Sequence, residues 1–280
     1  MKKRLMIFTT LKTIFVSMGA ILMTYPLIWM VVSSFRPELD IFRETSLIIR
    51  HFTLENYIRA LQGVAGTTFF EYMTNTLKLV LPVVAGTLIS SSFVGYAIAR
   101  LDFPFKSFAF TIILLTMMLP MHVMLIPRFI MFRELGWLGT YLPLIVPSFF
   151  AVQGFFNYLF IQFIRGIPKE LDQAATIDGC NPISVFFRII APLSVPAYIT
   201  AGIFSFLWTY DDFFSQMIYI TRPSEFTIAL ALRQYMDAFE LTAFGVMFAT
   251  SVMSLIPILV LFITCQKYLV EGIATTGLKG

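Results

Sequence analysis

Six long apolar stretches, separated by more polar segments, constrain this chain more than any other feature. They cover about residues 11–35, 74–99, 107–126, 142–164, 195–220 and 243–265. A helix needs about 20 apolar residues to cross the hydrocarbon core of a bilayer. The composition agrees, because 58% of the 280 residues are hydrophobic and only 13% are charged. Soluble domains are about half apolar and a quarter charged. We therefore predict one all-α membrane domain over residues 1–280, with six transmembrane helices.

Basic residues at the start of the chain predict its orientation. Lys2, Lys3 and Arg4 precede the first apolar stretch, and short loops rich in Lys and Arg stay in the cytoplasm. That stretch is long and no small-residue cleavage site follows it, so we expect an uncleaved span. Six spans then place both termini in the cytoplasm. The net charge of +4 needs no nucleic-acid partner, because basic cytoplasmic loops account for it.

A polar segment, residues 165–194, lies between the fourth and fifth stretches and predicts two short helices joined by a sharp turn. Pro168 suits the first turn of a helix, because its missing N–H would have no partner there. Gly179 can take the left-handed conformation that ends a helix. Asn181 can then cap a second helix that has Pro182 in its first position. We expect a compact cytoplasmic docking surface here.

This segment resembles the coupling loop of ABC-importer permeases, whose pattern is E-A-A, three residues, then Gly. The carbohydrate-importer form continues with D-G, a Phe, an Ile and P-L-x-x-P. The matching residues are Ala174, Ala175, Asp178, Gly179, Phe187, Ile190, Pro192, Leu193 and Pro196. One position departs from the pattern: the family's Glu is Gln173 here, so a neutral hydrogen bond would replace a charged contact to the partner.

The resemblance extends over nearly the whole chain and is strongest to the maltose-type second permease. Residues 95–100 resemble the family's G-Y-A-x-A-R, which precedes a short cytoplasmic turn. Residues 118–127 and 135–141, and the tail that ends at Lys279 and Gly280, also look like the sugar-permease pattern.

The resemblance implies a type I ABC importer permease fold, a place in the bacterial cytoplasmic (inner) membrane, and several partners. These are a second homologous permease, two copies of an ABC ATPase, an extracytoplasmic solute-binding protein, membrane lipid and a sugar, expected to be an oligosaccharide. The residues expected to couple to the ATPase are Glu170, Gln173, Ala174, Ala175, Asp178, Gly179 and Pro192.

We expect no catalytic residue, no metal and no cofactor on this chain. It has no G-x-x-x-x-G-K-[ST] loop, so ATP and Mg²⁺ should be held by the partner ATPase. His51 and His122 lie far apart in the sequence and form no H-E-x-x-H motif. The spacing of Cys180 and Cys265 suggests neither a metal site nor a disulfide.

Polar side chains inside the apolar stretches are candidates for the substrate path, because such groups are costly in a membrane. They are Asn75, Gln153, Asn157, Trp208, Tyr210, Asp211 and Asp212. The last three of these resemble the family's W-N-[DE] cluster, and an aromatic ring beside carboxylates suits a polyol. For each residue taken alone, a helix–helix hydrogen bond or an interfacial anchor is the competing interpretation.

The loop before the last span, residues 221–242, is expected outside the membrane. In maltose-type relatives a loop at this place reaches toward the bound sugar. We therefore expect it to contact the binding protein through Arg222, Thr227, Arg233 and Tyr235.

Three alternatives stay open from the sequence. A permease for a non-sugar solute such as glycerol phosphate would be favoured by a cationic path, but the spans contain no Arg cluster. An intramembrane enzyme would use the polar span residues as its site, although no G-x-S-x-G motif is present. A secondary transporter would be driven by an ion gradient, and the coupling-loop pattern would then have no purpose.

Overall fold

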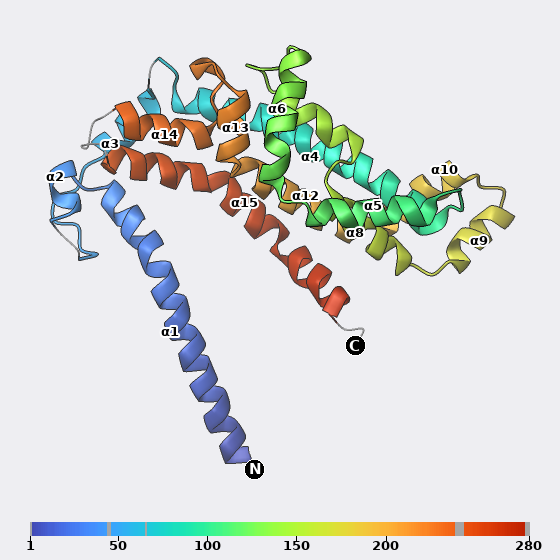
Figure 1. Cartoon of the computed structure of the whole chain (residues 1–280). Helices are drawn as coiled ribbons and strands as arrows, with labels where there is room; N and C mark the ends of the chain where they lie inside the picture. The colour runs from blue at the N-terminus through green and yellow to red at the C-terminus, as the bar shows by residue number, and fades with distance from the viewer. Residues whose placement is uncertain (1, 44–45, 65, 239–243, 278–280) are drawn as a thin grey trace. The chain divides into compact units, whose positions relative to one another are not determined.

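The computed structural model describes residues 2–43, 46–64, 66–238 and 244–277 (Figure 1). Within these ranges the regular structure is helical apart from one isolated bridge between Val64 and Thr67. The prediction of an all-α chain is confirmed. The chain divides into two compact units: Met1–Glu71 with Ala231–Ile256, and Tyr72–Leu230 with Pro257–Gly280.

The first unit contains the long helix α1 (Lys2–Ser34), the short helices α2 (Glu38–Ile41) and α3 (Glu55–Gln62), and parts of α14 (Ile228–Ala238) and α15 (Phe244–Gly277). The Glu38 carboxylate accepts hydrogen bonds from the backbone N–H groups of Phe244 at 2.7 Å and Gly245 at 2.9 Å. A carboxylate at this place satisfies free donors and complements the positive end of α15. The polar segment that follows the first apolar stretch therefore folds back onto the start of α15.

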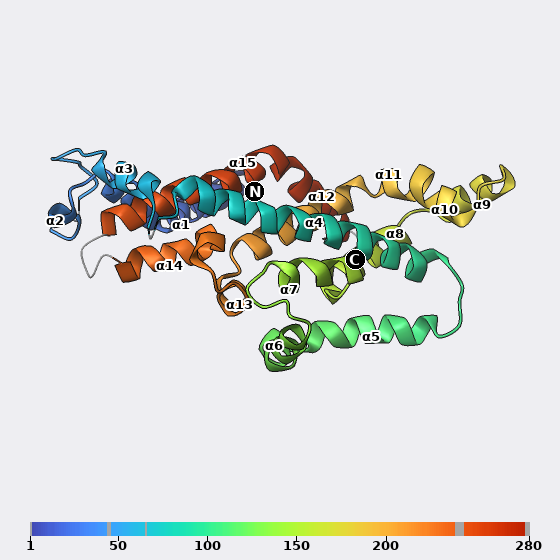
Figure 2. The same cartoon turned by 90° about the horizontal axis from the view of Figure 1, so that it is seen from above.

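The second unit begins within α4 (Phe69–Arg100) and carries most of the remaining elements. In chain order they are α5 (Lys106–Met118), η1 (Met121–Met124), α6 (Leu125–Glu134), α7 (Leu142–Ile145), η2 (Val146–Phe150), α8 (Gly154–Arg165), α9 (Glu170–Ile177), α10 (Pro182–Val185), the π-helical turn η3 (Phe186–Ile190), α11 (Ala191–Leu193), α12 (Val195–Tyr210), α13 (Phe213–Tyr219) and η4 (Pro223–Glu225). Helix α8 packs against both α5 and α12, and Figure 2 shows the helices from above.

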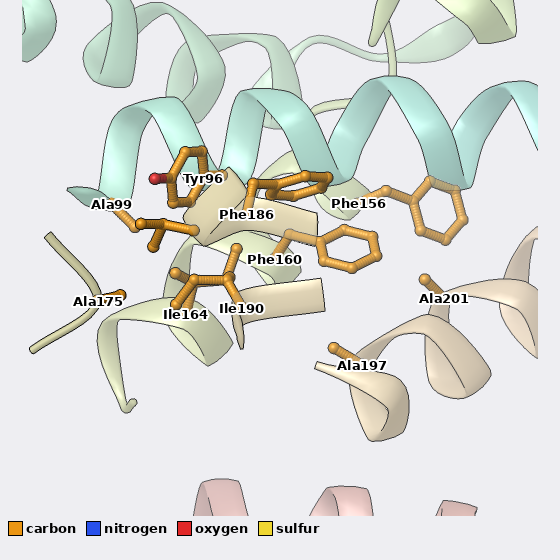
Figure 3. Close-up of a cluster of buried hydrophobic side chains, with 11 residues drawn as sticks. Tyr96, Ala99, Phe156, Phe160, Ile164, Ala175, Phe186, Ile190, Ala197 and Ala201 are labelled. Carbon is orange, nitrogen blue, oxygen red and sulfur yellow. The ribbon is translucent and has the colours of Figure 1, made fainter. Parts of the chain in front are cut away.

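A buried apolar core joins α4, α8, α12 and the segment from α9 to η3 (Figure 3). Its members are Tyr96, Ala99, Phe156, Phe160, Ile164, Ala175, Val185, Phe186, Ile190, Ala197 and Ala201. Aromatic rings supply much of the contact, for example Phe160 against Tyr198 with ring centroids 4.9 Å apart. The polar segment between the fourth and fifth stretches is thus part of the core and not a free loop.

In the described part of the chain, four helices are long and apolar enough to cross a membrane: Phe8–Ser34, Phe69–Arg100, Leu142–Arg165 and Phe244–Lys267. A fifth is added if Pro182–Leu193 and Val195–Tyr210, bent by 74°, count as one span. Helix α5 has 13 residues and is about 20 Å long, shorter than the roughly 30 Å hydrocarbon core. It ends at Met118, within the predicted stretch 107–126, because Leu119 before Pro120 has an extended backbone. The count of six spans and the orientation of the termini stay predictions.

The fourth and fifth apolar stretches each contain a short interruption of the helical backbone. The fourth is interrupted at residues 151–153, between η2 and α8. The fifth is interrupted between Tyr210, the last residue of α12, and Phe213, the first residue of α13. At the second break the Asp212 side chain accepts a hydrogen bond from the Ser215 backbone N–H at 3.0 Å, and this cap favours the start of a new helix.

Candidate functional site

The turn between α9 and α10 has the geometry expected from the sequence. Gly179 has a φ of 83°, and the N–H of Cys180 reaches the carbonyl of Ala175 at 2.9 Å. The N–H of Gly179 reaches the carbonyl of Thr176 at 3.0 Å. This pair of bonds is the Schellman arrangement that satisfies the end of a helix. The Asn181 side chain caps the next helix by accepting from Ser184 N–H at 2.8 Å.

Only the start of this helical pair differs from expectation. Helix α9 begins at Glu170, so Pro168 precedes it instead of lying in its first turn. The second helix begins at Pro182, as predicted, and its helical backbone continues through a π-turn to Leu193. The two helices form the surface that we name the coupling surface, residues 170–183.

The coupling surface has an inner and an outer side. Ala175 is buried in the core. The other residues expected to couple to a partner are exposed: Glu170, Gln173, Ala174, Asp178, Gly179 and Pro192. Two apolar side chains that the motif did not single out are also exposed, Ile177 at 87% and Ile183 at 69%. Large apolar residues exposed on both sides of a polar turn indicate a protein-binding surface, and their place beside Gly179 was the signal available in the sequence.

Side chains at the C-terminal end of α4 contact the inner side of the coupling surface. This end of α4 is predicted to face the cytoplasm. The Tyr96 hydroxyl donates to the Pro182 carbonyl at 3.0 Å. Arg100 donates through Nη2 to the Ile167 carbonyl at 2.6 Å, and its Nε lies 2.7 Å from Oδ2 of Asp172. The coupling surface is therefore attached to a helix that precedes it by many residues in the chain.

The break in the fourth stretch is supported by one of the predicted path residues. Ala151 has a φ of 51°, which is uncommon for a residue with a side chain. The Asn157 side chain is 4% exposed and donates through Nδ2 to the Ala151 carbonyl at 2.6 Å. Gln153 precedes α8 with extended backbone and is half-buried. Because α8 begins only after Gln153, Gln153 and Asn157 do not lie on one face of a helix.

The second break lies next to the first. The Trp208 ring, near the end of α12, packs against Phe155 and Phe156 at the start of α8, with centroids 5.0 and 5.3 Å away. Trp208 is nevertheless 48% exposed, and Asp211 is exposed at the break itself. Irregular backbone at membrane depth is tolerated where protein covers it or where it lines a cavity.

The other predicted path residues are engaged within the unit. Tyr210 is 4% exposed, and Asp212 caps α13. Asn75, 7% exposed, donates through Nδ2 to the carbonyls of Ser224 at 2.8 Å and Phe226 at 3.1 Å. Of the set, Trp208, Asp211 and Gln153 keep surface available to a ligand.

The segment at residues 221–227 is tied down at several points. Thr227 is fully buried and donates to the side-chain oxygen of Gln216. The Tyr141 hydroxyl donates to the Glu225 carbonyl at 2.7 Å. Burial, and secondarily the charge of Glu225, raise the pKa of Tyr141 to about 12, so this hydroxyl remains a donor throughout the physiological pH range. Arg222 keeps an exposed side chain that pairs with Glu225 at 3.3 Å.

The remaining two residues expected at a binding protein lie in the first unit. Arg233 is exposed on α14. Tyr235 is fully buried, and its hydroxyl donates to the Ala60 carbonyl at 2.7 Å. Among the four candidates the structure therefore exposes Arg222 and Arg233 and buries Thr227 and Tyr235. Within the described part of the chain, no group of three or more His, Cys, Asp or Glu side chains is arranged to hold a metal ion.

The match to known proteins decides the family. Residues 91–274 match the family described as "Binding-protein-dependent transport system inner membrane component". The chain belongs to this family. It is a multi-pass permease of the inner membrane and a transporter subunit, not an enzyme, and its family name implies a partner that binds the solute.

Relatives that span nearly the whole permease include carbohydrate transporters. It is 30% identical to the arabinooligosaccharides transport system permease protein AraQ of Halalkalibacterium halodurans, covering 98% of both chains. It is also 30% identical to the trehalose/maltose transport system permease protein MalG of Thermococcus litoralis, over 96% of this chain and 98% of that protein. Identity reaches 34% with the probable ABC transporter permease YurM of Bacillus subtilis, over 95% of this chain and 87% of that one.

A solved structure supports the fold. The permease superimposes with a TM-score of 0.83 on a chain from a bacterial ABC transporter involved in the import of the acidic polysaccharide alginate. The match covers 94% of this chain and 96% of that chain at 21% identity. The predicted ABC importer permease fold is confirmed.

Proposed function

We propose that this permease is one of two transmembrane subunits of an importer that carries an oligosaccharide across the inner membrane. ATP and Mg²⁺ are held by two copies of a separate ATPase, and a solute-binding protein delivers the sugar from outside. The observation that best supports this proposal is the coupling surface, a pair of short helices joined by a sharp turn with exposed apolar side chains on either side of it, in a chain that belongs to the permease family.

The ATPase docks on the outer side of the coupling surface. Ile177 and Ile183 stand on either side of the Gly179 turn and are largely exposed. Burying an Ile side chain contributes about 1.5–3 kcal/mol, so these two residues supply the apolar centre of the contact. Exposed polar residues, including Gln173 and Asp178, form its rim, as is usual in protein interfaces.

The cargo is a neutral oligosaccharide. The relatives named for arabinooligosaccharides and for trehalose and maltose support the substrate class. At the paired breaks, the half-exposed Trp208 offers an apolar face to a sugar ring and the exposed Asp211 offers a hydrogen-bond acceptor to its hydroxyl groups. A carboxylate at this place disfavours an anionic solute such as glycerol phosphate.

The binding protein contacts the permease through exposed basic side chains. Arg233 on α14 is one such contact, and Arg222 beside η4 is another. A cysteine at Arg233 should crosslink to the binding protein in the assembled transporter. Tyr235→Cys is the matched internal control, because the side chain at that position is fully buried.

Uptake into proteoliposomes tests the function. The permease is reconstituted with the second permease, the ATPase and the binding protein, and ATP is enclosed with the ATPase. A series of labelled neutral oligosaccharides and glycerol phosphate is offered from the binding-protein side. ATP-dependent uptake of an oligosaccharide supports the proposal. Uptake by this chain alone without ATPase, or uptake of glycerol phosphate only, overturns it.

A further inference from the structure

The pattern at residues 95–100, at the end of α4, has no part in the function proposed so far. Its first residue allows two helices to touch. A Cβ atom added to Gly95 would lie 2.5 Å from Cβ of Phe160 in α8, closer than real side chains approach. Glycine at this position therefore permits the end of α4 to lie directly against the helix that leads into the coupling surface.

The second residue of the pattern holds α10. Tyr96 places its ring against Phe186, with centroids 5.2 Å apart, and its hydroxyl donates to the carbonyl of Pro182 at 3.0 Å. Figure 3 shows Tyr96 and Ala99 of α4 turned toward Phe186, Ile164 and Ala175. The first residue of α10 is thus bonded to α4 across the core.

The last residue of the pattern holds α9. The Arg100 side chain is 4% exposed and pairs with the Asp172 side chain, which is 21% exposed. The same guanidinium donates through Nη2 to the Ile167 carbonyl, just before α9. The other carboxylate oxygen of Asp172, Oδ1, is buried and has no hydrogen-bond partner in the described ranges. Loss of Arg100 would leave this carboxylate without its cation.

The position of Asp172 sets the direction of the docking residues. Residues three or four apart on a helix share one face. Asp172 and the buried Ala175 form the inner face of α9, whereas Gln173 and Ile177 form the exposed face. Because the planar guanidinium engages two points at once, it restrains α9 against rotation about its own axis. Rotation would turn Ile177 away from the ATPase.

We propose that Arg100 is a positioning residue for energy coupling, which together with Tyr96 locks both coupling helices onto the end of α4. Movement of the ATPase is then transmitted directly to α4, and not only to α8 and α12, which flank the coupling surface in the chain. This inference rests on the proposed function, in which an ATPase docks on that surface.

Variants of the assembled transporter test the lock. Arg100→Gln and Asp172→Asn should lower ATPase stimulation by loaded binding protein, and uptake with it, by roughly 5- to 150-fold, the usual range of coupling between sites. The charge exchange, Arg100→Asp with Asp172→Arg, should recover part of the loss, and Arg100→Lys should be intermediate. Recovery by exchange would not occur if Asp172 served only to contact the ATPase.

The control is a second ion pair near the same helix end. Lys106 and Asp102 pair at 3.2 Å, with Asp102 98% exposed, and exposed pairs contribute little. Asp102→Asn should therefore couple normally. If Arg100→Gln and Asp172→Asn assemble and couple as well as Asp102→Asn does, the lock is refuted. A charge exchange no better than either single variant also refutes it.

Hydrogen exchange on the full chain separates this inference from the proposed function. Amides of α9 should be protected in the native permease and exchange faster in Arg100→Gln, whether or not an ATPase is present.

A distance measurement tests transmission through α4. Spin labels at Asp102→Cys and Lys169→Cys, both exposed sites, should stay at the same distance from each other with and without ATP in the complex. A separation that changes with ATP overturns transmission through α4. Absence of ATP-driven uptake by the unaltered complex would instead refute the proposed function.

Discussion

The coupling surface and the break in the fourth apolar stretch both interrupt a helix with a left-handed residue, but they do so by different means. At the coupling surface the residue is Gly179, with a φ of 83° and no atom within 4 Å of the place a Cβ would take. At the break it is Ala151, with a φ of 51° and a bond from Asn157 to its carbonyl. The first turn is favoured by its own residue type, whereas the second is held by a neighbouring side chain.

This difference has a physical meaning. Glycine adopts positive φ at almost no cost, whereas a residue with a Cβ pays roughly 1–2 kcal/mol. A turn that must keep its backbone conformation when a partner protein binds is best formed by a residue that favours that conformation. A turn that is supported by a hydrogen bond from a neighbouring side chain can change when that bond is lost. The predictions below test this contrast.

The largest effect is expected from Gly179→Val. A β-branched residue at this φ is strained by about 1–3 kcal/mol, and α10 should then be misplaced relative to α9. We expect a loss of ATPase stimulation by loaded binding protein in the reconstituted complex. Gly179→Asn is the matched control, because asparagine tolerates the left-handed region and the space around the position is open. If the Val variant couples as well as the Asn variant, the turn does not depend on φ.

Asn157→Ala should destabilise the permease by about 0.5–1.5 kcal/mol, the usual net contribution of one intramolecular hydrogen bond. It removes the bond to the Ala151 carbonyl. Unfolding in a denaturing detergent measures the effect. Asn157→Ala together with Ala151→Gly should recover stability relative to Asn157→Ala alone, because glycine does not need the support. Additive losses in the double variant would show that Asn157 does not act on this turn.

The two carboxylates at the second break should separate into a structural and a transport role. Asp212→Ala removes the cap on α13 and should cost about 0.5–2 kcal/mol of stability. Asp211→Asn should leave complex yield unchanged and alter sugar uptake, because this side chain is exposed and caps nothing in the described structure. Equal loss of yield in both variants would assign both residues to the structure.

Ala151→Gly alone should change stability by less than about 1 kcal/mol, because relief of the strain is offset by the greater freedom of glycine in the unfolded chain. Gly179→Ala should be clearly destabilising by comparison, since its φ of 83° disfavours a Cβ. Detergent unfolding of the two variants side by side measures the difference. A stability loss in Ala151→Gly as large as that in Gly179→Ala would contradict the contrast between the two turns.

The smallest effect is expected from Gln173→Glu. This residue is exposed on the outer side of α9, and the family's Glu occupies the same place. The added charge lies in the second turn of the helix, so its effect on helix stability is within a few tenths of a kcal/mol. Coupling should be retained or improved, as ATPase stimulation would show. Uncoupling in this variant, with normal coupling in Gly179→Val, would show that the side chain at position 173, and not the turn at Gly179, determines the contact with the ATPase.

The sequence by itself determined the features that depend on near neighbours. The apolar stretches identify a helical membrane protein, because hydropathy over about 20 residues is a local property. The turn at Gly179 and the cap at Asn181 were predictable for the same reason, since the groups they satisfy lie within five residues. The match of the coupling loop to its family's pattern likewise lies within one short segment.

Only the tertiary structure decided where the spans break and what holds the coupling surface. An apolar run looks the same whether its helix is continuous or interrupted, because neighbouring elements satisfy the freed backbone groups. Alanine at position 151 carries no signal of a positive φ. Asn75 bonds to carbonyls 149 and 151 residues away, and Arg100 to one that is 67 residues away. Partners so distant in the chain meet only when the helices pack, and this packing makes the residues at the end of α4 a support for α9 and α10.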